Sequence, residues 1–370
     1  MPVLSTIGAM AARGFGWLYQ AAVPLISGNL YSWGQNDSGQ IGDNTTVNKS
    51  SPVQIGSLST WKAIGSGSSF NFGILTDGTL WAWGYNLDGR LGLNDLTNRS
   101  SPTQIGALTT WAKIVPGRAI KTDGTLWTWG VNTLGQLGDG TTTSRSSPVQ
   151  VGALTNWSII SSNASIKTDG TLWTWGFNSS GQLGLGDTTN RSSPVQVGSG
   201  TNWKYISSGN HALAVKTDGT LWSWGANTTG ELGLGDTTNR SSPVQVGSGT
   251  NWADVAMSNT SSLAVKTDGT LWAWGANASG QIGDGTTTAK SSPVQIGSLT
   301  NWSGVESGGS MSVALKTNGT LWTWGTNAGG QLGLGDTTSR SSPVQVGAAT
   351  NWAIISANAG TNAPLAIRSV

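Results

Sequence analysis

Few residues in this chain of 370 could do acid–base or nucleophilic chemistry, because it has one histidine, no cysteine and 17 acidic residues. His211 is the single candidate for a general base near neutral pH, whereas a glycosidase would need two carboxylates at a set separation. Twelve acidic residues recur at two positions of a repeated unit, a Thr-Asp-Gly turn and a Gly-rich loop. Five others depart from that frame, and no pair among them stands out: Asp37, Asp88, Glu231, Asp254 and Glu306. We therefore expect no enzymatic activity, with a glycan-active enzyme as one alternative.

Seven cations also recur at one position of the unit, each with an Asp four or six residues earlier: Lys49, Arg99, Arg145, Arg191, Arg240, Lys290 and Arg340. Local pairing with that Asp is favoured over a ring that binds anions. One carboxylate per loop is too few oxygens for calcium, so we expect neither a metal nor a cofactor. The net charge of +2 is too small for phosphate binding, and no nucleic-acid role is expected.

The surface composition bears on location. The chain holds 55 glycines and 21 tryptophans, but only 10% of its residues are charged. A surface built from Thr, Ser, Asn and Gly rather than Lys and Glu favours an extracellular or virion location, and the lack of cysteine fits exported bacterial and viral proteins.

These loops and turns are positioned by a repeat that is read from its Trp-Gly pairs. The pairs lie at spacings of 50, 46, 46, 49, 50 and 50 residues: Trp33, Trp83, Trp129, Trp175, Trp224, Trp274 and Trp324. In the fullest unit, residues 201–247, short apolar or alternating runs are separated by Gly, Asn, Asp and Pro clusters. Each unit therefore predicts four short β-strands.

The third strand of each unit carries the packing signal. Trp81 and Trp83 are two residues apart and project from one face, while the residue between such Trp pairs is always Ser, Ala or Thr. A large face meeting a small face is what dense packing of one sheet on another requires. We expect the tryptophans to lie between stacked sheets.

The two ends of the repeat region decide between an open solenoid and a closed ring. The sequence from residue 351 matches the first two strands of a unit, and residues 28–56 match the last two. An open solenoid would need polar capping repeats at both ends. The half-units instead predict one composite blade that closes a seven-bladed, all-β propeller over residues 28–370, with no open sheet edge.

The phrases DGTLWTWG and GQLGLGDTTNRSSPVQV closely resemble the repeat of the regulator of chromosome condensation family. The resemblance covers about residues 28–368, recurs seven times and implies a seven-bladed β-propeller. That family includes a nucleotide-exchange factor that docks on chromatin, a plant ultraviolet photoreceptor and a secreted β-lactamase inhibitor, so it implies a scaffold for binding loops. The small net charge argues against a chromatin role, and the photoreceptor's Gly-Trp-Arg-His-Thr phrase is absent.

The hairpins between the first two strands vary most between units. From the opening Trp to the turn residue is 12 residues after Trp111 and Trp157, but 15 or 16 in the other intact units. Successive strands reverse direction, so these hairpins and the Gly-rich loops share one face, and loops on a rigid scaffold commonly bind partners. Drift in unconstrained turns is the alternative. The candidate binding residues on this face are Phe70, Asn71, Tyr85, Arg118, Asn163, Phe177, Asn210, His211, Met257, Asn259 and Met311.

Residues 1–27 lie outside the repeats and are apolar apart from Arg13. Glycines interrupt the segment, so we expect no membrane span, and it lacks the basic start of a secretory signal. Residues 4–16, LSTIGAMAARGFG, resemble the leaders of bacteriophage tail and virion-appendage proteins, which implies a docking arm. The arm residues expected to contact a particle are Leu4, Ile7, Arg13, Phe15, Trp17 and Leu18.

The function expected from the sequence is that of a non-enzymatic virion protein, such as a tail or capsid appendage, within an oligomeric assembly. Other virion proteins would bind residues 1–27, and a host surface protein or glycan would bind the hairpin side. The alternative is an exported bacterial propeller that acts as a binding or inhibitor module.

Overall fold

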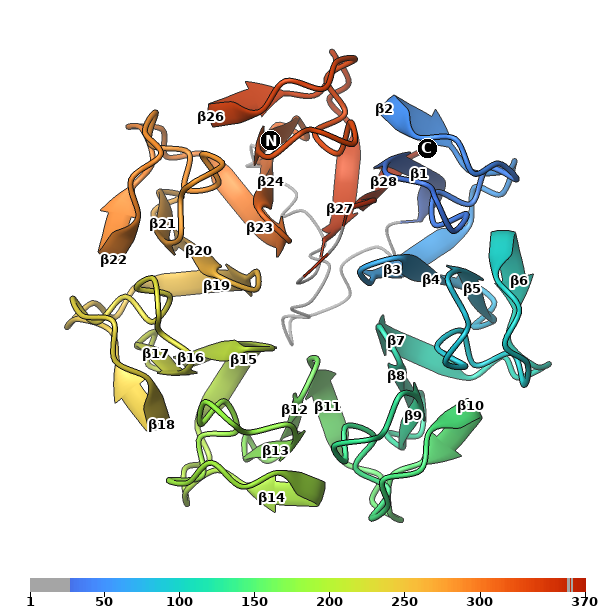
Figure 1. Cartoon of the computed structure of the whole chain (residues 1–370), viewed down its shortest axis with the longest axis horizontal. Coiled ribbons are helices and arrows are strands. Elements are labelled where there is room, and N and C mark those ends of the chain that lie inside the picture. The colour runs from blue at the N-terminus through green and yellow to red at the C-terminus, as the bar shows by residue number, and fades with distance from the viewer. Residues whose placement is uncertain (1–26, 358–359, 361) are drawn as a thin grey trace, which may run out of the picture.

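A computed structural model describes residues 27–357, 360 and 362–370, which form 28 strands in seven blades around a central axis (Figure 1). Within that part of the chain no helix is present, and so none could cross a membrane. The predicted docking-arm residues Leu4 to Leu18 lie outside the described residues.

Six blades are continuous in sequence, and each is a four-stranded antiparallel sheet. The first consists of β3 (Trp61–Ser66), β4 (Phe70–Leu75), β5 (Leu80–Gly84) and β6 (Arg99–Gln104). The second consists of β7 (Trp111–Val115), β8 (Arg118–Lys121), β9 (Leu126–Gly130) and β10 (Arg145–Gln150). The third consists of β11 (Trp157–Ile160), β12 (Ala164–Lys167), β13 (Leu172–Gly176) and β14 (Arg191–Gln196). The fourth consists of β15 (Trp203–Ser208), β16 (His211–Lys216), β17 (Leu221–Gly225) and β18 (Arg240–Gln245). The fifth consists of β19 (Trp252–Met257), β20 (Ser261–Lys266), β21 (Leu271–Gly275) and β22 (Lys290–Gln295). The sixth consists of β23 (Trp302–Gly308), β24 (Met311–Lys316), β25 (Leu321–Gly325) and β26 (Arg340–Gln345).

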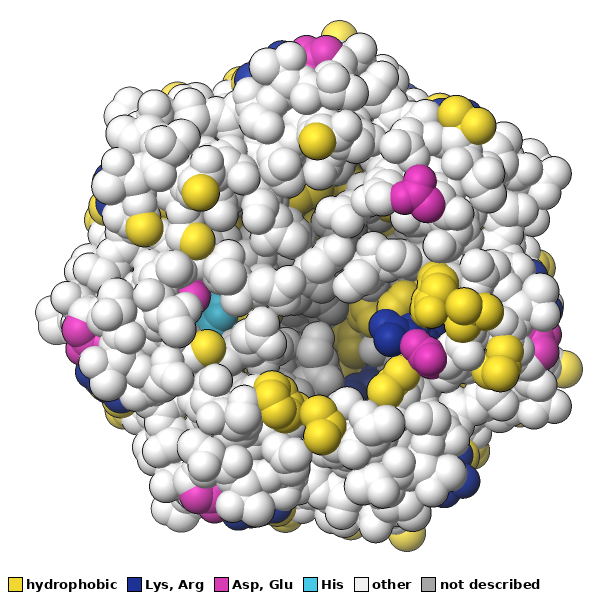
Figure 2. Space-filling view, in the orientation of Figure 1, with side chains coloured by type: hydrophobic (Ala, Val, Ile, Leu, Met, Phe, Trp, Pro, Cys, Tyr) yellow, Lys and Arg dark blue, Asp and Glu magenta, His cyan; other side chains and the backbone are white. Residues whose placement is uncertain are grey.

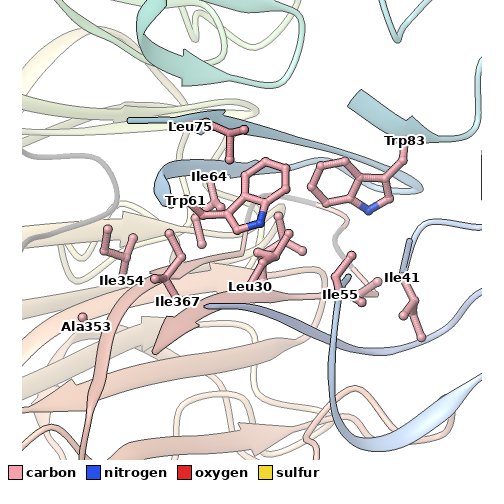
Figure 3. Packing of buried hydrophobic residues seen from close by; sticks show 12 residues of the cluster. Leu30, Ile41, Ile55, Trp61, Ile64, Leu75, Trp83, Ala353, Ile354 and Ile367 are labelled. Atoms are coloured by element: carbon pink, nitrogen blue, oxygen red, sulfur yellow. The ribbon is translucent and has the colours of Figure 1, made fainter. Parts of the chain in front are cut away.

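The seventh blade, here called the closing blade, combines both ends of the described chain. It consists of β27 (Trp352–Ser356), β28 (Leu365–Ser369), β1 (Gly28–Gly34) and β2 (Lys49–Gln54). β1 pairs with β28 from Gly28 opposite Ser369 to Ser32 opposite Leu365. Leu30, Ile354 and Ile367 then pack with Trp61 and Trp83 of the next blade (Figure 3). The predicted propeller and its closure by two half-blades are confirmed.

The seams between blades are made by the second Trp of each Trp-Gly strand. Trp83, for example, is fully buried against Ile41 and Ile55 of the preceding blade, and its indole N–H donates to Gln40 O at 3.0 Å. The same bond to the preceding blade recurs at 2.7–3.1 Å in all seven units: Trp33, Trp83, Trp129, Trp175, Trp224, Trp274 and Trp324. The predicted place of Trp between stacked sheets is confirmed.

The Gly-rich loops are held by the Asn that follows each variable residue after Trp-Gly. Asn86 Nδ2 donates to Asp95 Oδ1 at 3.0 Å, and its Oδ1 accepts from Leu91 N–H at 2.8 Å. Gly89, at φ +71°, permits the turn between them, and a Cβ there would lie 2.7 Å from Ser146 Cα of the next blade. Each loop is thus held in one conformation by its own hydrogen bonds and packs closely against the next blade.

Two faces result from this geometry. The hairpins between the first and second strands, together with the Gly-rich loops between the third and fourth, form the hairpin face, which Figures 1 and 2 show towards the viewer. The Thr-Asp-Gly turns and the links from one blade to the next form the opposite turn face.

Candidate binding face

Five of the eleven candidate residues reach the surface of the hairpin face. Phe177 is 38% exposed, Asn210 and Asn259 are exposed, and Tyr85 and Asn163 are half-buried. These side chains are available to a partner in the isolated chain.

The other six candidates are buried, which corrects the prediction that they are displayed on the face. None is more than 9% exposed: Phe70, Asn71, Arg118, His211, Met257 and Met311. The reason is local. In this fold the strand-end residues beside a hairpin turn their side chains into the seams, where Asn71 Nδ2 donates to Gln40 O at 2.6 Å and Met311 packs against Trp33 and Trp352. Their variation between units reflects packing of individual seams.

His211 is a seam residue with one defined tautomer. Its Nε2 lies 2.8 Å from Ser262 Oγ in the next blade, and that hydroxyl donates its proton to Glu231 O at 2.8 Å. Because Ser262 has only one hydroxyl proton, His211 Nε2 must be the donor, and Nδ1 has no partner among the described residues. Burial lowers the pKa of His211 to about 3, so the ring stays neutral and no acid–base role follows.

Arg118 is a buried guanidinium without a carboxylate within ion-pair distance in the described chain. It donates to Ser161 O at 3.2 Å and to Gln136 O at 2.6 Å, and it lies 4.5 Å from the ring centroid of Trp175. Burial lowers its pKa to about 9. The side chain ties the β7–β10 blade to its neighbour.

No pair among the off-frame acids stood out in the sequence as catalytic, and the structure brings two of them, Asp254 and Glu306, close enough to interact. They lie on β19 and β23, at neighbouring positions around the axis, and burial together with the Asp254 charge raises the pKa of Glu306 well above its usual range. Asp254 Oδ2 accepts from Val305 N–H at 3.4 Å, and Glu306 accepts from Ala357 N–H. Each acid therefore clasps the next blade, as Ser207 does with Met257 N–H.

The cavity beside Glu306 is too small for a substrate. It measures about 20 Å³, room for about one water, and is lined by Ser161, Ser207, Val255 and Met257 among others. Of the remaining off-frame acids, Asp88 pairs with Arg90 at 2.9 Å, Glu231 accepts from Thr229 N–H at 2.8 Å, and Asp37 accepts from Gln35. Among the described residues no cluster of three or more metal-binding side chains is found.

The seven loop cations are paired locally, as predicted. Each lies 2.5–3.2 Å from the carboxylate of its own loop: Lys49–Asp43, Arg99–Asp95, Arg145–Asp139, Arg191–Asp187, Arg240–Asp236, Lys290–Asp284 and Arg340–Asp336. The same carboxylates accept from loop backbone N–H groups, as Asp95 does from Thr97 at 2.9 Å. These charges hold the loops and are not offered to an anion.

One part of the hairpin face, here called the aromatic patch, groups exposed or half-buried apolar side chains around a cation: Tyr85, Leu87, Arg90, Leu134 and Phe177. Leu87 is 57% exposed and Leu134 38%. Arg90 replaces the Gln or Glu of the other units, and its guanidinium lies 5.7 Å from the ring centroids of both Tyr85 and Phe70. Figure 2 shows yellow side chains beside dark-blue and magenta ones to the right of the central hollow.

The patch is continuous across three blades because their loops abut. A Cβ added at Gly130 would lie 3.5 Å from Arg90 Cα, and one at Gly176 would lie 3.3 Å from Gln136 Cα. Val131 and Phe177 follow these glycines directly. The loops that start at Tyr85, Val131 and Phe177 thus form one curved strip.

The rim of the central hollow is lower next to this strip. β7, β8, β11 and β12 have four or five residues, whereas β3, β4, β15, β16, β19 and β20 have six. At about 3.3 Å per residue, the two short hairpins lower the rim by about 3–7 Å. The shorter spacing after Trp111 and Trp157 was the sequence signal for this step.

Comparison with known families finds one repeat throughout the propeller. The regulator of chromosome condensation (RCC1) repeat model matches residues 27–74, 77–119, 123–164, 169–215, 218–265, 268–315 and 318–367. A second model of that repeat matches residues 61–90 and 252–281. No curated protein matches the sequence significantly.

Several solved structures share the fold. Human WBSCR16 is 20% identical with a TM-score of 0.82, covering 92% of this chain and 99% of its own. Prp20p from Saccharomyces cerevisiae, whose structure was described with its binding properties to Gsp1p and histones, is 19% identical with a TM-score of 0.80, covering 94% and 93%. Yeast RCC1 (Prp20) in a complex with Kap60 is 18% identical with a TM-score of 0.80, covering 96% and 95%. Identities this low establish the fold alone.

Proposed function

This chain belongs to the regulator of chromosome condensation repeat family, and we propose that it is a non-enzymatic binding protein whose protein partner docks on the aromatic patch. A propeller of this family is a rigid scaffold suited to protein binding. The observation that carries the proposal is the asymmetry of the hairpin face: among the described residues, its exposed large apolar side chains all belong to this strip of loops except Val47.

The chemistry of the patch fits a protein partner. Aromatic residues and Arg are enriched among the side chains that contribute most to protein interfaces. Tyr85 and Phe177 supply rigid apolar surface, and Arg90 is already oriented by Asp88 and two rings. The lowered rim beside the strip would let a convex element of the partner reach towards the axis.

A capture experiment with matched variants tests this proposal. The double variant Tyr85→Ser, Phe177→Ser removes the patch, while Leu58→Ser, Leu108→Ser removes two leucines on the turn face that are 43% and 48% exposed. A partner retained by the wild-type chain and by the turn-face control, but lost from the patch variant, is the expected result. Equal retention by all three proteins would contradict the proposal.

We further propose that the protein is a virion component, such as a tail or capsid appendage, with residues 1–27 bound to other virion proteins and the propeller displayed outside. The support is the phage-like leader phrase and the Thr, Asn, Ser and Gly-rich surface without cysteine. An exported bacterial binding or inhibitor protein is the alternative, in which residues 1–27 would be removed.

Intact mass spectrometry and light scattering on the natural material separate these two origins. A virion component should keep residues 1–27 and run as an assembly with particle proteins. A mature chain that begins near Gly28 and occurs free in the medium would overturn the virion proposal, while leaving the patch proposal to its own test.

A further inference from the structure

A cation lies over paired aromatic rings in six of the seven blades, on the side away from the hairpins. In five blades it is the Lys that precedes the Asp or Asn turn, 3.6–4.1 Å from one indole centroid and 4.6–4.9 Å from a second: Lys121, Lys167, Lys216, Lys266 and Lys316. In the closing blade Arg368 takes this place, 5.2 Å from the Trp352 ring and 5.3 Å from the Tyr31 ring. The closing blade therefore keeps one Trp of this arrangement, Trp352, but has Arg368 in place of the Lys and Tyr31 in place of the other Trp.

The first Trp of every blade has an indole N–H without an acceptor among the described residues: Trp61, Trp111, Trp157, Trp203, Trp252, Trp302 and Trp352. Each of these side chains is at most 6% exposed. These nitrogens are also closed to solvent, so a ligand in a groove would contact the indole ring and not its N–H. At Trp302 and Trp352 the indole lines a groove between two blades.

The two grooves differ in size. The groove at Trp352, here called the closing groove, lies between β26 and β2, which are neighbours at the top of Figure 1. Its volume is about 610 Å³, against about 370 Å³ for the sister groove at Trp302. Ala349 lines the closing groove where Leu299 lines the sister groove, so a smaller side chain accompanies the larger space.

The two grooves also differ in their charged side chains. The sister groove has Lys316 and Asp284 among its lining residues, but the Asp284 carboxylate already pairs with Lys290 at 3.1 Å. The closing groove has Arg368 and no Asp or Glu among its lining residues. Both grooves therefore present a cation, and the closing groove differs in carrying a guanidinium, whose planar fork matches a carboxylate, in place of an ammonium.

Arg368 has hydrogen-bonding capacity to spare. Its Nε–H donates to Asn351 Oδ1 at 3.1 Å, and one Nη1–H donates to the Tyr31 hydroxyl at 3.5 Å. A guanidinium has five N–H donors in a fork that matches a carboxylate, so the others have no partner in the described chain. No carboxylate of the described residues lies within ion-pair distance of Arg368.

We propose that the closing groove binds a sugar acid, a pyranose that carries a carboxylate. Arg368 takes the carboxylate through its unpartnered N–H groups. Tyr31 and Trp352 meet edge to face, with ring centroids 5.4 Å apart at 75°, and form an apolar corner for the C–H face of the ring. The groove is within the usual size range of small-molecule sites.

This inference goes beyond the proposed function and does not use the hairpin face. An oxyanion alone would be satisfied by Arg368, but it would leave the aromatic corner unused. A neutral sugar would use the corner but not the charge. The sugar acid is the ligand class that uses both features.

Titration of the full chain with methyl glucuronoside and methyl glucoside, by calorimetry and by Trp fluorescence, tests the proposal. A charge-assisted pair predicts that the glucuronoside binds about 10–100-fold more tightly than the glucoside. Arg368→Gln should reduce glucuronoside binding to the level of the glucoside. Lys316→Gln, which removes the equivalent cation of the sister groove, should leave it unchanged.

A second variant guards against misfolding at the blade closure. Ala349→Leu introduces the side chain that the sister groove already holds at Leu299, so the fold tolerates it, and it should block the sugar while Arg368 remains. Three results would each overturn the proposal. These are acetate binding as tightly as the glucuronoside, Lys316→Gln and Arg368→Gln weakening binding equally, and no binding of either sugar at about 10 mM, which would mean that the groove holds water alone.

Discussion

The neutral, buried His211 makes a specific prediction about acid stability. Its pKa falls from 6.5 to about 3 on folding, because burial disfavours the charged ring. A depressed pKa in the folded state contributes stability that is complete above pH 6.5 and is lost as pH falls towards 3. The loss amounts to about 1.4 kcal/mol per pH unit, hence about 2 kcal/mol at pH 5.0 and on the order of 5 kcal/mol near pH 3.

The variant that isolates this effect is His211→Met. Met311 occupies the equivalent strand position, opposite Gly325 as His211 is opposite Gly225, and it is fully buried. Every other titrating group is common to the two proteins. The difference in unfolding free energy between variant and wild type should therefore move by about 2 kcal/mol in favour of the variant between pH 7.5 and pH 5.0.

Denaturant unfolding at several pH values, followed by Trp fluorescence, measures this difference. The single histidine also gives one imidazole resonance in nuclear magnetic resonance spectra, which should not titrate between pH 7.5 and pH 5.0 in the folded protein. A free-energy difference that stays constant with pH, or an imidazole that titrates near 6.5, would refute the assignment of a buried neutral ring.

Two further predictions concern the seams. Burial and the Asp254 charge raise the pKa of Glu306. The wild-type chain therefore loses stability as pH rises from 4.5 through that raised pKa. The variant Glu306→Gln keeps an acceptor for Ala357 N–H and should be the more stable protein above neutral pH. In denaturant unfolding that advantage should shrink towards pH 4.5, and a pH-independent advantage would contradict this. Gly219 and Gly247 both have positive φ, but a Cβ at Gly219 would lie 1.9 Å from Thr250 O, whereas at Gly247 nothing lies within 4 Å. Gly247→Ala should cost about 1–2 kcal/mol and Gly219→Ala clearly more, so equal thermal shifts would show that the close contact relaxes.

The architecture was predictable from the sequence because each signal occurs six or seven times. The Trp-x-Trp-Gly strand, the small residue between the tryptophans and the Asp before each loop cation all recur, so accidental matches average out. The half-units at residues 28–56 and 351–368 then fixed the closure by simple complementarity, as the pairing of Gly28 with Ser369 confirms. Alternation of side chains along a strand was enough for each of these inferences.

The direction of the variable side chains was not predictable in the same way. Phe70, His211 and Met311 begin strands beside variable hairpins, and the sequence alone does not say whether such a residue faces solvent or a neighbouring blade. Asp254 and Glu306 are 52 residues apart, and they come together only because the ring places β19 beside β23. The cation over paired Trp rings was missed, although each such Lys precedes a turn at a fixed distance from both tryptophans.

Departure from the repeat is therefore evidence of function only where the departing side chain keeps unused bonding capacity at a surface. His211 and Arg118 depart from the repeat, but their polar groups are already hydrogen-bonded at a seam. His211 contacts Ser262, and Arg118 donates to Ser161 O and Gln136 O. Arg368 also breaks the frame, yet it lines an open groove with N–H donors to spare beside the Tyr31 and Trp352 rings. In a seam, the polar groups of one blade must find hydrogen-bond partners in the next blade for the ring to close. A variable residue there is therefore matched by a residue of the neighbouring blade. At a groove the missing partner has to come from outside, which is why the closing groove is the place to look for a small ligand and the aromatic patch the place to look for a protein.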